Sequence, residues 1–342
     1  MKNDEPIDIV YLWVDGNDPV WRLKRQRAVE KMSVGNRHAM AVYGNVEGRF
    51  RDNDELRHSL RALEKFFPEH GHVYIVTDAQ APSWLGVSDR FTIVDHLDLI
   101  PEASLPTFDS GNIESYIHRI PNLSERYFYF NDDVFFGSPV NVNDWFWEGG
   151  IYVAWSDEPE VSDEPLRPDA TALENACRLS RQWLSSHGRH MAGPCAHTFR
   201  TFAHSPRPML RSVLFELEEI AADLFEVVRS TVFRTWDKPT IISDFVMRWA
   251  LANGVAKTRD YTHLYVSTGA AAEEMQLDLL VSTVGVLDFF CVNDTTDDAH
   301  PHDPRLALVR EALQEVFPHP SIFEDHFTLH SRRSKAKASV SA

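Results

Sequence analysis

Residues 7–16 read IDIVYLWVDG, and this stretch decides the fold class. Its first part, from Ile7 to Val14, is rich in β-branched and aromatic residues, which is typical of a buried strand. The Asp15-Gly16 pair that follows is typical of a turn, so we expect the strand to end at a carboxylate. A carboxylate at a strand end can contact a ribose, a base or a metal ion, or it can belong to an ordinary turn.

Helices and strands alternate along the chain beyond this first strand. A helix is predicted over residues 52–67, because Leu56, Leu60 and Leu63 repeat at the spacing of one helical face. Asp52 and Glu55 occupy the positions of a capping box at its start. Further strands are predicted at 73–77, 91–94, 127–130, 151–155 and 287–292. The alternation predicts an α/β fold with a mostly parallel sheet, which binds ligands beyond the carboxyl ends of its strands.

The adjacent carboxylates of Asp132 and Asp133 follow the strand predicted at 127–130. Two neighbouring carboxylates repel each other unless a cation offsets their charge, and Mg²⁺ prefers oxygen ligands of this kind. The alternative is a plain turn, because Asn and Asp side chains also bond the local backbone. Asn131, just before the pair, fits either interpretation.

A second candidate group precedes the helix predicted at 52–67. Arg49 and Arg51 lie just before its N-terminus, where anions are favoured, and arginine is a bidentate phosphate ligand. The alternative is a surface loop in which these arginines pair with Asp52, Asp54 and Glu55.

Composition excludes several classes of protein. The chain of 342 residues has 34 Lys plus Arg and 51 Asp plus Glu, a formal charge of −17, which disfavours bulk attraction to nucleic acid or anionic membranes. Three widely spaced cysteines indicate no disulfide framework and no cysteine zinc site, so we expect a reducing compartment. We find no P-loop, no G-x-G-x-x-G and no G-x-S-x-G motif.

The sequence also predicts no signal peptide and no transmembrane segment. The first residues are acidic and their apolar run is short, and the region from Leu279 to Val292 is broken by polar residues. A cytoplasmic protein is therefore expected. The basic residues of the tail, Arg332, Arg333, Lys335 and Lys337, leave open a peripheral contact with the inner face of the membrane.

Four groups of motifs, taken in order, carry a resemblance to a known family. They are IDIVYLWVDGNDP at 7–19; RFRDNDELR at 49–57 with YFNDD at 129–133; HSP at 204–206 with FR at 233–234; and FCVND at 290–294 with PSIFE at 320–324. The sequence resembles the Stealth family of hexose-1-phosphate transferases. That family includes bacterial capsular and exopolysaccharide phosphotransferases and the catalytic region of the animal N-acetylglucosamine-1-phosphotransferase. One departure is Leu12, where threonine is common in the family.

The resemblance implies transfer of sugar-1-phosphate from a UDP-sugar, such as UDP-N-acetylglucosamine, to a hydroxyl of a glycan acceptor. The product is a phosphodiester and UMP is released. The implied fold is a Rossmann-like, GT-A-like nucleotide-sugar transferase with a mixed sheet and a mainly helical insertion. The sequence pattern itself predicts four parts: an α/β part at 1–155, a mainly helical part at 156–285, a completing strand and helix at 286–328, and a disordered tail at 329–342.

The resemblance also implies roles for individual residues. Phosphoryl transfer needs in-line positioning, charge neutralisation and removal of a proton from the acceptor. The implied catalytic residues are His204 as general base, Arg234 as charge stabiliser and Asp132. The implied metal ligands, for Mg²⁺ or Mn²⁺, are Asp132, Asp133 and Asp294. The implied substrate-binding residues are Asp15, Arg49, Arg51, Asn53, Asn131 and Asn293.

Two other functions fit the same sequence. A conventional metal-dependent glycosyltransferase would attack the anomeric carbon and release UDP instead of UMP. A nucleotide-sugar-binding protein without activity would bind the donor and turn nothing over, although the full set of polar motif residues disfavours it.

Overall fold

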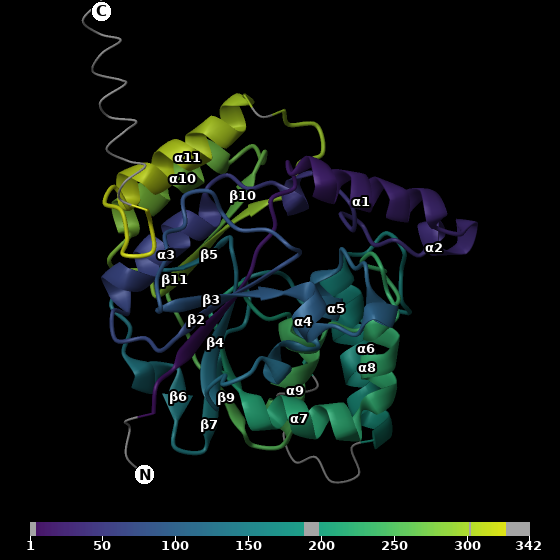
Figure 1. Cartoon of the computed structure of the whole chain (residues 1–342). Coiled ribbons are helices and arrows are strands. Elements are labelled where there is room, and N and C mark those ends of the chain that lie inside the picture. The colour runs from purple at the N-terminus through teal and green to yellow at the C-terminus, as the bar shows by residue number, and fades with distance from the viewer. Residues whose placement is uncertain (1–4, 188–197, 301, 326–342) are drawn as a thin grey trace, which may run out of the picture.

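The computed structural model describes residues 5–187, 198–300 and 302–325 (Figure 1). Its centre is a five-stranded sheet in the order β3-β2-β1-β4-β8. The strands are β1 (Asp8–Leu12), β2 (Val73–Thr77), β3 (Phe91–Asp95), β4 (Arg126–Asn131) and β8 (Arg207–Leu210). The first four run parallel, and β8 pairs antiparallel with β4. This order confirms the predicted α/β fold, because 3-2-1-4 is the strand order of a Rossmann-like sheet.

The strand ends meet at one edge of this sheet. Leu12 at the end of β1 is opposite Asn131 at the end of β4, and Thr77 of β2 is opposite Asp95 of β3. All of β1 and β2 is buried, which explains their continuous apolar sequence. The residues that follow β1 and β4 are therefore brought together at the carboxyl edge.

Two smaller sheets extend this core. One has the order β10-β11-β5, formed by β10 (His263–Thr268), β11 (Phe289–Asp294) and β5 (Val134–Phe136). The other has the order β6-β7-β9, formed by β6 (Phe146–Trp147), β7 (Gly150–Val153) and β9 (Ala256–Thr258). Because β5 follows the Asp132-Asp133 turn and pairs with β11, Asn293 and Asp294 are carried towards that turn.

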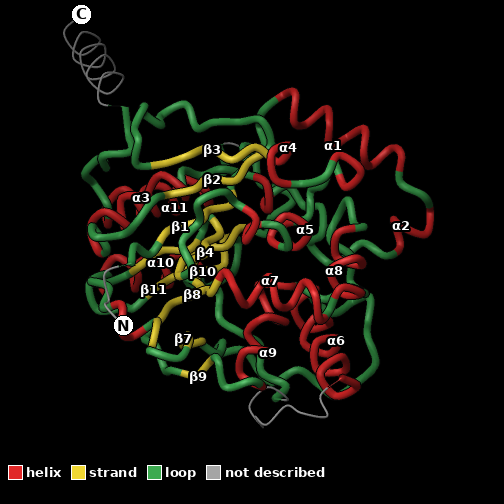
Figure 2. The backbone as a smooth tube through the Cα atoms, turned by 60° about the horizontal axis from the view of Figure 1, so that its bottom comes forward, coloured by secondary structure: helices red, strands yellow, loops and turns green. Residues whose placement is uncertain are grey.

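The helices gather in separate groups around the sheets (Figures 1 and 2). One group, α3 (Glu55–Phe66), α10 (Glu273–Thr283) and α11 (Pro304–Val316), packs together. A second gathers at the other end: α5 (Ser110–Glu114), α6 (Ala172–His187), α7 (Arg211–Ile220), α8 (Ala222–Arg229) and α9 (Val246–Ala252). The short helix α4 (His96–Leu99) directly follows β3 and contacts it. In both views α1 (Pro19–Lys31) and α2 (Val34–His38) extend away from the main body.

The segment 156–285 contains the helices α6, α7, α8, α9 and α10 together with three strands, and it does not stand apart from the sheets. Its strand β8 pairs with β4, and its strand β10 pairs with β11. One continuous hydrophobic core contains residues from each of the three predicted parts, 1–155, 156–285 and 286–328. The tail at 329–342 lies outside the described residues. Within the described ranges, no helix is both long enough and apolar enough to cross a membrane.

The start of α3 differs from the predicted capping box. The helix begins at Glu55 after Asp54, whose φ of 68° is left-handed, and no side chain caps it. Asp52 instead accepts from the Asp54 N–H at 2.9 Å, and Glu55 accepts from the side chain of Asn53 at 2.9 Å. The capping-box prediction was wrong. These polar side chains form hydrogen bonds within the sharp turn before the helix, and none of them caps its first N–H groups.

A buried ion cluster fastens the C-terminal segment to α3. Glu324, with 1% of its side chain exposed, accepts hydrogen bonds from Arg57 and Arg61 at 2.6 Å and from the Ser321 N–H at 2.9 Å. Burial raises the pKa of the Glu324 carboxyl, but the bonds from Arg61, Ser321 and Arg57 outweigh burial and lower that pKa to about 2. The ionised carboxylate of Glu324 therefore stabilises the folded state.

Glu324→Gln should lower the free energy of unfolding by about 3 kcal/mol at pH 7, because it leaves two arginines partly buried without their counterion. The folded pKa of Glu324 lies below its unfolded value, so its contribution is full above pH 5 or so and is lost as the pH falls towards 2. Urea unfolding of the unmodified protein and of the Glu324→Gln variant, measured from pH 7 to pH 3, checks this dependence of stability on pH. A stability difference that does not shrink with falling pH would contradict the ionic account.

Candidate active site

A cavity of about 150 Å³ lies at the carboxyl edge of the central sheet. Its wall combines apolar side chains from the ends of β1 and β2 with polar groups from six separate segments. The polar lining residues include Arg49, Arg51, Glu55, Asn131, Asp132, Asp133, Arg234, Asn293 and Asp294. The fold thus brings together most of the residues that the sequence singled out.

The turn between β4 and β5 places the predicted acidic pair in this cavity. The Asp133 Oδ2 atom accepts hydrogen bonds from Asn293 Nδ2 at 2.9 Å and from the Cys291 thiol at 3.5 Å. Its Oδ1 atom is buried and has no hydrogen-bond partner among the described residues. A buried carboxylate oxygen without a partner is costly, so Asp133 is ready to bind a cation or a donor.

Four carboxyl groups interact around this turn: Asp132, Asp133 and Glu55 line the cavity, and Asp52 lies outside its lining. Burial, followed by the charges of Asp133 and Asp52, raises the pKa of Asp132 well above its ordinary value. Burial likewise raises the pKa of Asp133, against the hydrogen bonds from Asn293 and Cys291. Burial also raises the pKa of Glu55 and brings that of Asp52 to about 7. The excess negative charge is what a divalent cation would offset.

The donor set suits Mg²⁺ or Mn²⁺, because it consists of hard carboxylate oxygens. Among the residues that the structure describes, no three His, Cys, Asp or Glu side chains are grouped to hold an ion by themselves. Magnesium at diphosphate sites commonly uses one or two carboxylates and completes its shell with phosphates and water. Asp132 and Asp133 therefore fit a metal that binds together with a diphosphate.

Asp294 does not complete a set of three ligands with this pair. Its carboxylate forms an ion pair with Arg51 and also accepts from the N–H and hydroxyl of Thr296 at 2.8 and 2.7 Å. Arg51 in turn donates to the Thr296 hydroxyl at 3.0 Å and to the Ala299 carbonyl at 2.9 Å. Asp294 can therefore act as a metal ligand, and Arg51 as a phosphate partner, only if the ion pair between them breaks.

Two guanidinium groups face the same cavity with unused N–H donors. Arg49 Nε is buried without a hydrogen-bond partner among the described residues, and so is Arg234 Nε. Burial and the charge of Arg234 lower the pKa of Arg49 to about 9, which still leaves its guanidinium charged near pH 7. Two unsatisfied cationic donors beside buried carboxylates form a receptor for an anion, and planar guanidinium groups match phosphate oxygens.

A buried ion pair behind Arg234 holds that side chain in place. Arg234 Nη2 donates to the Ser110 hydroxyl at 2.7 Å, and its Nε lies 4.0 Å from Asp109 Oδ1. Asp109 is fully buried, pairs with Lys238 and accepts from the Thr231 hydroxyl at 2.7 Å. Burial raises the pKa of Asp109, but the charges of Lys238 and Arg234 outweigh burial and keep it below its ordinary value.

His204 is not one of the residues that line this cavity, although the charge of Arg234, which does line it, acts on its ring. Its ring is 5.4 Å from the ring of Tyr265, and its Nδ1 atom is buried without a hydrogen-bond partner among the described residues. Burial, then the charges of Arg207 and Arg234, lower the pKa of His204 to about 4. The imidazole is therefore neutral near pH 7, and the lowered pKa makes it a weaker base than an ordinary histidine.

The structure places the other predicted substrate residues as follows. Asn131 lines the cavity and accepts from the Tyr129 hydroxyl at 2.8 Å. Asn53 is buried and bonded to Glu55. The Asp15 carboxylate accepts from the Asn17 N–H at 2.8 Å and is not one of the lining residues of this cavity. Asp15 is instead tied through its backbone to the side chain of Gln80.

Sequence reasoning missed the residues that support Arg234. Asp109 and Lys238 are 129 positions apart, and no spacing pattern connects them. It also treated Asp52 and Glu55 as partners for nearby arginines or as helix caps, whereas in the fold both lie close enough to Asp132 for their like charges to act on each other. The run of acidic residues at 52–55 is the one signal that could have suggested this.

Family models match three stretches of this chain. Three family models match: Stealth protein CR1, conserved region 1, at residues 5–33; CR2, conserved region 2, at 49–153; and CR4, conserved region 4, at 286–334. These regions include Asp132, Asp133 and Asn293, whereas His204 and Arg234 lie between the second and the third of them. Their roles therefore rest on the motifs HSP and FR and on the geometry above.

Curated relatives span nearly the whole chain. The exopolysaccharide phosphotransferase SCO6023 of Streptomyces coelicolor is 35% identical over 93% of this chain and 52% of that protein. The exopolysaccharide phosphotransferase CpsY of Mycobacterium leprae is 32% identical over 98% of this chain and 60% of that protein. The capsular polysaccharide phosphotransferase LcbA of Aeromonas hydrophila is 32% identical over 91% of this chain and 85% of its own length. The chain thus spans between half and two thirds of the length of the first two.

Solved structures with low sequence identity also match. The galactosyltransferase LgtC is 9% identical with a TM-score of 0.42 and covers 94% of this chain and 99% of its own. Mouse xyloside xylosyltransferase 1 is 10% identical with a TM-score of 0.39 and covers 84% of this chain and 98% of its own.

Proposed function

Because this chain belongs to the Stealth family, we propose that it is a phosphotransferase of capsular or exopolysaccharide synthesis. It transfers sugar-1-phosphate from a UDP-sugar, UDP-N-acetylglucosamine or a related hexose, to a hydroxyl of a glycan acceptor, and it releases UMP. One observation carries the proposal: Arg49 and Arg234, whose Nε atoms have no hydrogen-bond partner among the described residues, line the same cavity as Asp132 and Asp133. Cations and a metal-binding carboxylate pair are what a diphosphate requires.

The reaction needs no bond change at the sugar ring. The acceptor oxygen bonds to the phosphorus next to the sugar, the bond from that phosphorus to the bridging oxygen breaks, and UMP leaves with the electron pair. Arg49 and Arg234 bind the oxygens on which charge develops. Asp132 and Asp133 would hold Mg²⁺ or Mn²⁺, which neutralises phosphate charge when bound. The proton of the acceptor hydroxyl passes to His204.

Product analysis tests the reaction type. The protein is incubated with Mn²⁺, a panel of UDP-sugars and glycan fragments, and the released nucleotide is identified by mass. UMP with a phosphodiester-linked acceptor supports the proposal. UDP with a directly glycosylated acceptor would identify a conventional glycosyltransferase, and donor binding without turnover would identify a binding protein.

His204→Ala tests the assignment of the general base. We expect kcat to fall by roughly 10²- to 10³-fold, because removal of a positioned base costs that much, while the Kd for the donor stays within about twofold. Steady-state kinetics and calorimetric titration with the UDP-sugar measure the two quantities. His72→Ala, which removes an imidazole that bonds Thr92 on β3, is the control. A collapse of donor affinity would make His204 a phosphate-binding residue and leave the base elsewhere.

A further inference from the structure

Glu114 is a buried acid that the proposed reaction does not use, although it lies one side chain away from the candidate active site. It ends α5 and is only 2% exposed. Its Oε1 atom is 2.9 Å from the Tyr129 hydroxyl, and that hydroxyl is 2.8 Å from Oδ1 of Asn131, which lines the active-site cavity. Tyr129 and Asn131 are two residues apart on β4, so their side chains leave the strand on the same face. The three side chains therefore form one polar chain that ends at the cavity wall.

The number of hydrogens in this chain limits how it can be arranged. Burial and the charge of Glu114 raise the pKa of the Tyr129 hydroxyl well above its ordinary value, so it keeps its one hydrogen. An ionised carboxylate and an amide oxygen can only accept, and one O–H cannot donate fully to both. Either Glu114 carries a proton and donates it to Tyr129, which donates to Asn131 Oδ1, or the amide of Asn131 is turned over and its NH2 group donates to the hydroxyl. In the second arrangement Glu114 is ionised.

The surroundings of Glu114 favour the protonated arrangement. Within the described ranges, its carboxyl group has the Tyr129 hydroxyl as its hydrogen-bond partner, its Oε2 atom is buried with none, and no cation lies within the 4.0 Å of an ion pair. An ionised carboxylate held by one neutral hydrogen bond is costly to bury, and a neutral acid avoids most of that cost. Burial raises the pKa of Glu114, and it outweighs the charges of Arg207 and Arg234, which act in the opposite direction.

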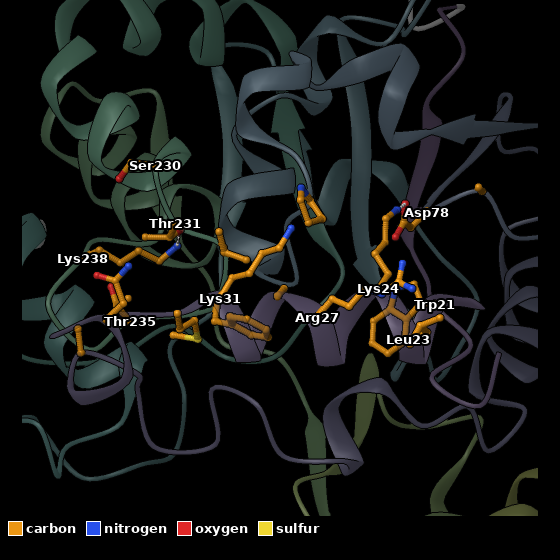
Figure 3. A pocket seen from close by; sticks show the side chains of 18 of the residues that line it. Trp21, Leu23, Lys24, Arg27, Lys31, Asp78, Ser230, Thr231, Thr235 and Lys238 are labelled. Atoms are coloured by element: carbon orange, nitrogen blue, oxygen red, sulfur yellow. Dashed lines mark hydrogen bonds and ion pairs between the residues drawn. The ribbon is translucent and has the colours of Figure 1, made fainter. Parts of the chain in front are cut away.

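Five charged side chains act on this acid from neighbouring segments without forming an ion pair with it: Arg207, Arg234, Asp109, Arg49 and Lys238. Arg207 of β8 donates to three backbone carbonyls at 3.3–3.4 Å, and Arg234 donates to a hydroxyl at the start of α5 at 2.7 Å. Lys238 pairs with Asp109 and donates to the Thr231 hydroxyl at 3.0 Å, at the wall of a second cavity of about 960 Å³ (Figure 3). Arg207, Arg234 and Lys238 therefore have other partners, which leaves the acid without a counterion if it ionises.

The protonated arrangement decides which side of the Asn131 amide is left for a ligand. When Oδ1 accepts from Tyr129, the NH2 group of Asn131 has no partner among the described residues, and the side chain lines the cavity. We propose that Glu114 is a protonated positioning residue, which acts through Tyr129 to hold the Asn131 NH2 group ready to donate to the phosphate oxygens of the UDP-sugar. An amide turned the other way would offer an oxygen, which suits a metal ion but not a phosphate. The contact with the UDP-sugar rests on the proposed function, whereas the proton on Glu114 does not.

Infrared difference spectroscopy of the full chain tests the proton on Glu114. The spectrum of the unmodified protein minus that of Glu114→Gln, both without metal at pH 7, should contain the carbonyl stretch of a protonated carboxylic acid. Glu164→Gln is the control, because Glu164 is exposed and its hydrogen bonds from Ser162 and Arg167 lower its pKa. Its difference spectrum should contain the bands of an ionised carboxylate. A Glu114 difference spectrum of that second kind would overturn the proposal.

Calorimetric titration with UDP in the presence of Mn²⁺ tests the rest of the chain without turnover. Tyr129→Phe removes the hydroxyl that holds the Asn131 amide, so the Kd for UDP should rise by about tenfold. Glu114→Gln should keep this Kd within about twofold, because the NH2 group of a glutamine donates to the hydroxyl as the acid does. Tyr127→Phe is the matched control, since Tyr127 is a buried tyrosine of the same strand whose hydroxyl has no partner among the described residues, and its Kd should be unchanged.

Two binding results would contradict the proposal. A Glu114→Gln variant that loses as much affinity for UDP as Tyr129→Phe would show that the ionised carboxylate is the active form. An unchanged Kd in Tyr129→Phe would show that the amide of Asn131 needs no support or makes no contact with the phosphates. Failure of the proposed function looks different: release of UDP instead of UMP from a UDP-sugar would refute phosphotransfer and leave both the infrared band and the binding difference in place.

Discussion

Asp133→Asn and Asp132→Asn are each expected to lower kcat by about a thousandfold, which corresponds to about 4 kcal/mol of lost transition-state stabilisation. An amide of the same shape removes the negative charge that would hold the metal against the diphosphate. The fold should survive, because burial and mutual repulsion already raise the pKa of both carboxyls and disfavour their charged forms. The thermal midpoint of the metal-free variants should therefore be unchanged or higher.

Transfer of radiolabelled sugar phosphate and calorimetric titration with Mn²⁺ in the presence of UDP check this expectation. Asp95→Asn is the matched control, since Asp95 also ends a strand of the central sheet but caps α4 through the Leu97 N–H at 2.8 Å. An asparagine can keep that cap, so this variant should retain both turnover and Mn²⁺ affinity. Near-normal turnover in both Asp132→Asn and Asp133→Asn would remove the basis for a metal at this turn.

Arg234→Met is expected to lower kcat by about a thousandfold, at the lower end of what removing an arginine from a phosphoryl-transfer site costs. Methionine keeps much of the length of the side chain but supplies neither charge nor N–H donors. Asp109 keeps its ion pair with Lys238 and its bond from Thr231, so the support behind the site stays satisfied. Arg234→Lys should recover only part of the activity, because a lysine cannot reproduce the planar fork.

Single-turnover kinetics with saturating donor separate the chemical step from binding in these variants. Arg259→Met removes an exposed arginine that pairs with Asp144 at 2.9 Å, and it should leave the rate unchanged. A rate for Arg234→Met within tenfold of the unmodified protein would show that Arg49 alone neutralises the phosphate.

Much of the fold could be predicted from local patterns. The continuous apolar runs of β1 and β2 indicated buried parallel strands, and Leu56, Leu60 and Leu63 indicated the buried face of α3, where all three are at most 1% exposed. The patterns could not show that β8 joins the central sheet or that β10 pairs with β11, because pairing between strands far apart in the chain depends on the register of the whole core.

The sequence by itself determined that Asp132 and Asp133 lie at a strand end, because the β-branched and aromatic run before them forms β4, which ends at Asn131. Only the tertiary structure decided which charges are free to act. Arg51 and Asp294, predicted to serve phosphate and metal, are held by each other, whereas Arg49 and Arg234 keep unused donors. Asp109 and Lys238 acquire their supporting role only where burial brings them together. The reason is physical: whether a charge is paired or available depends on distance and on exclusion of water, and neither is encoded in local spacing.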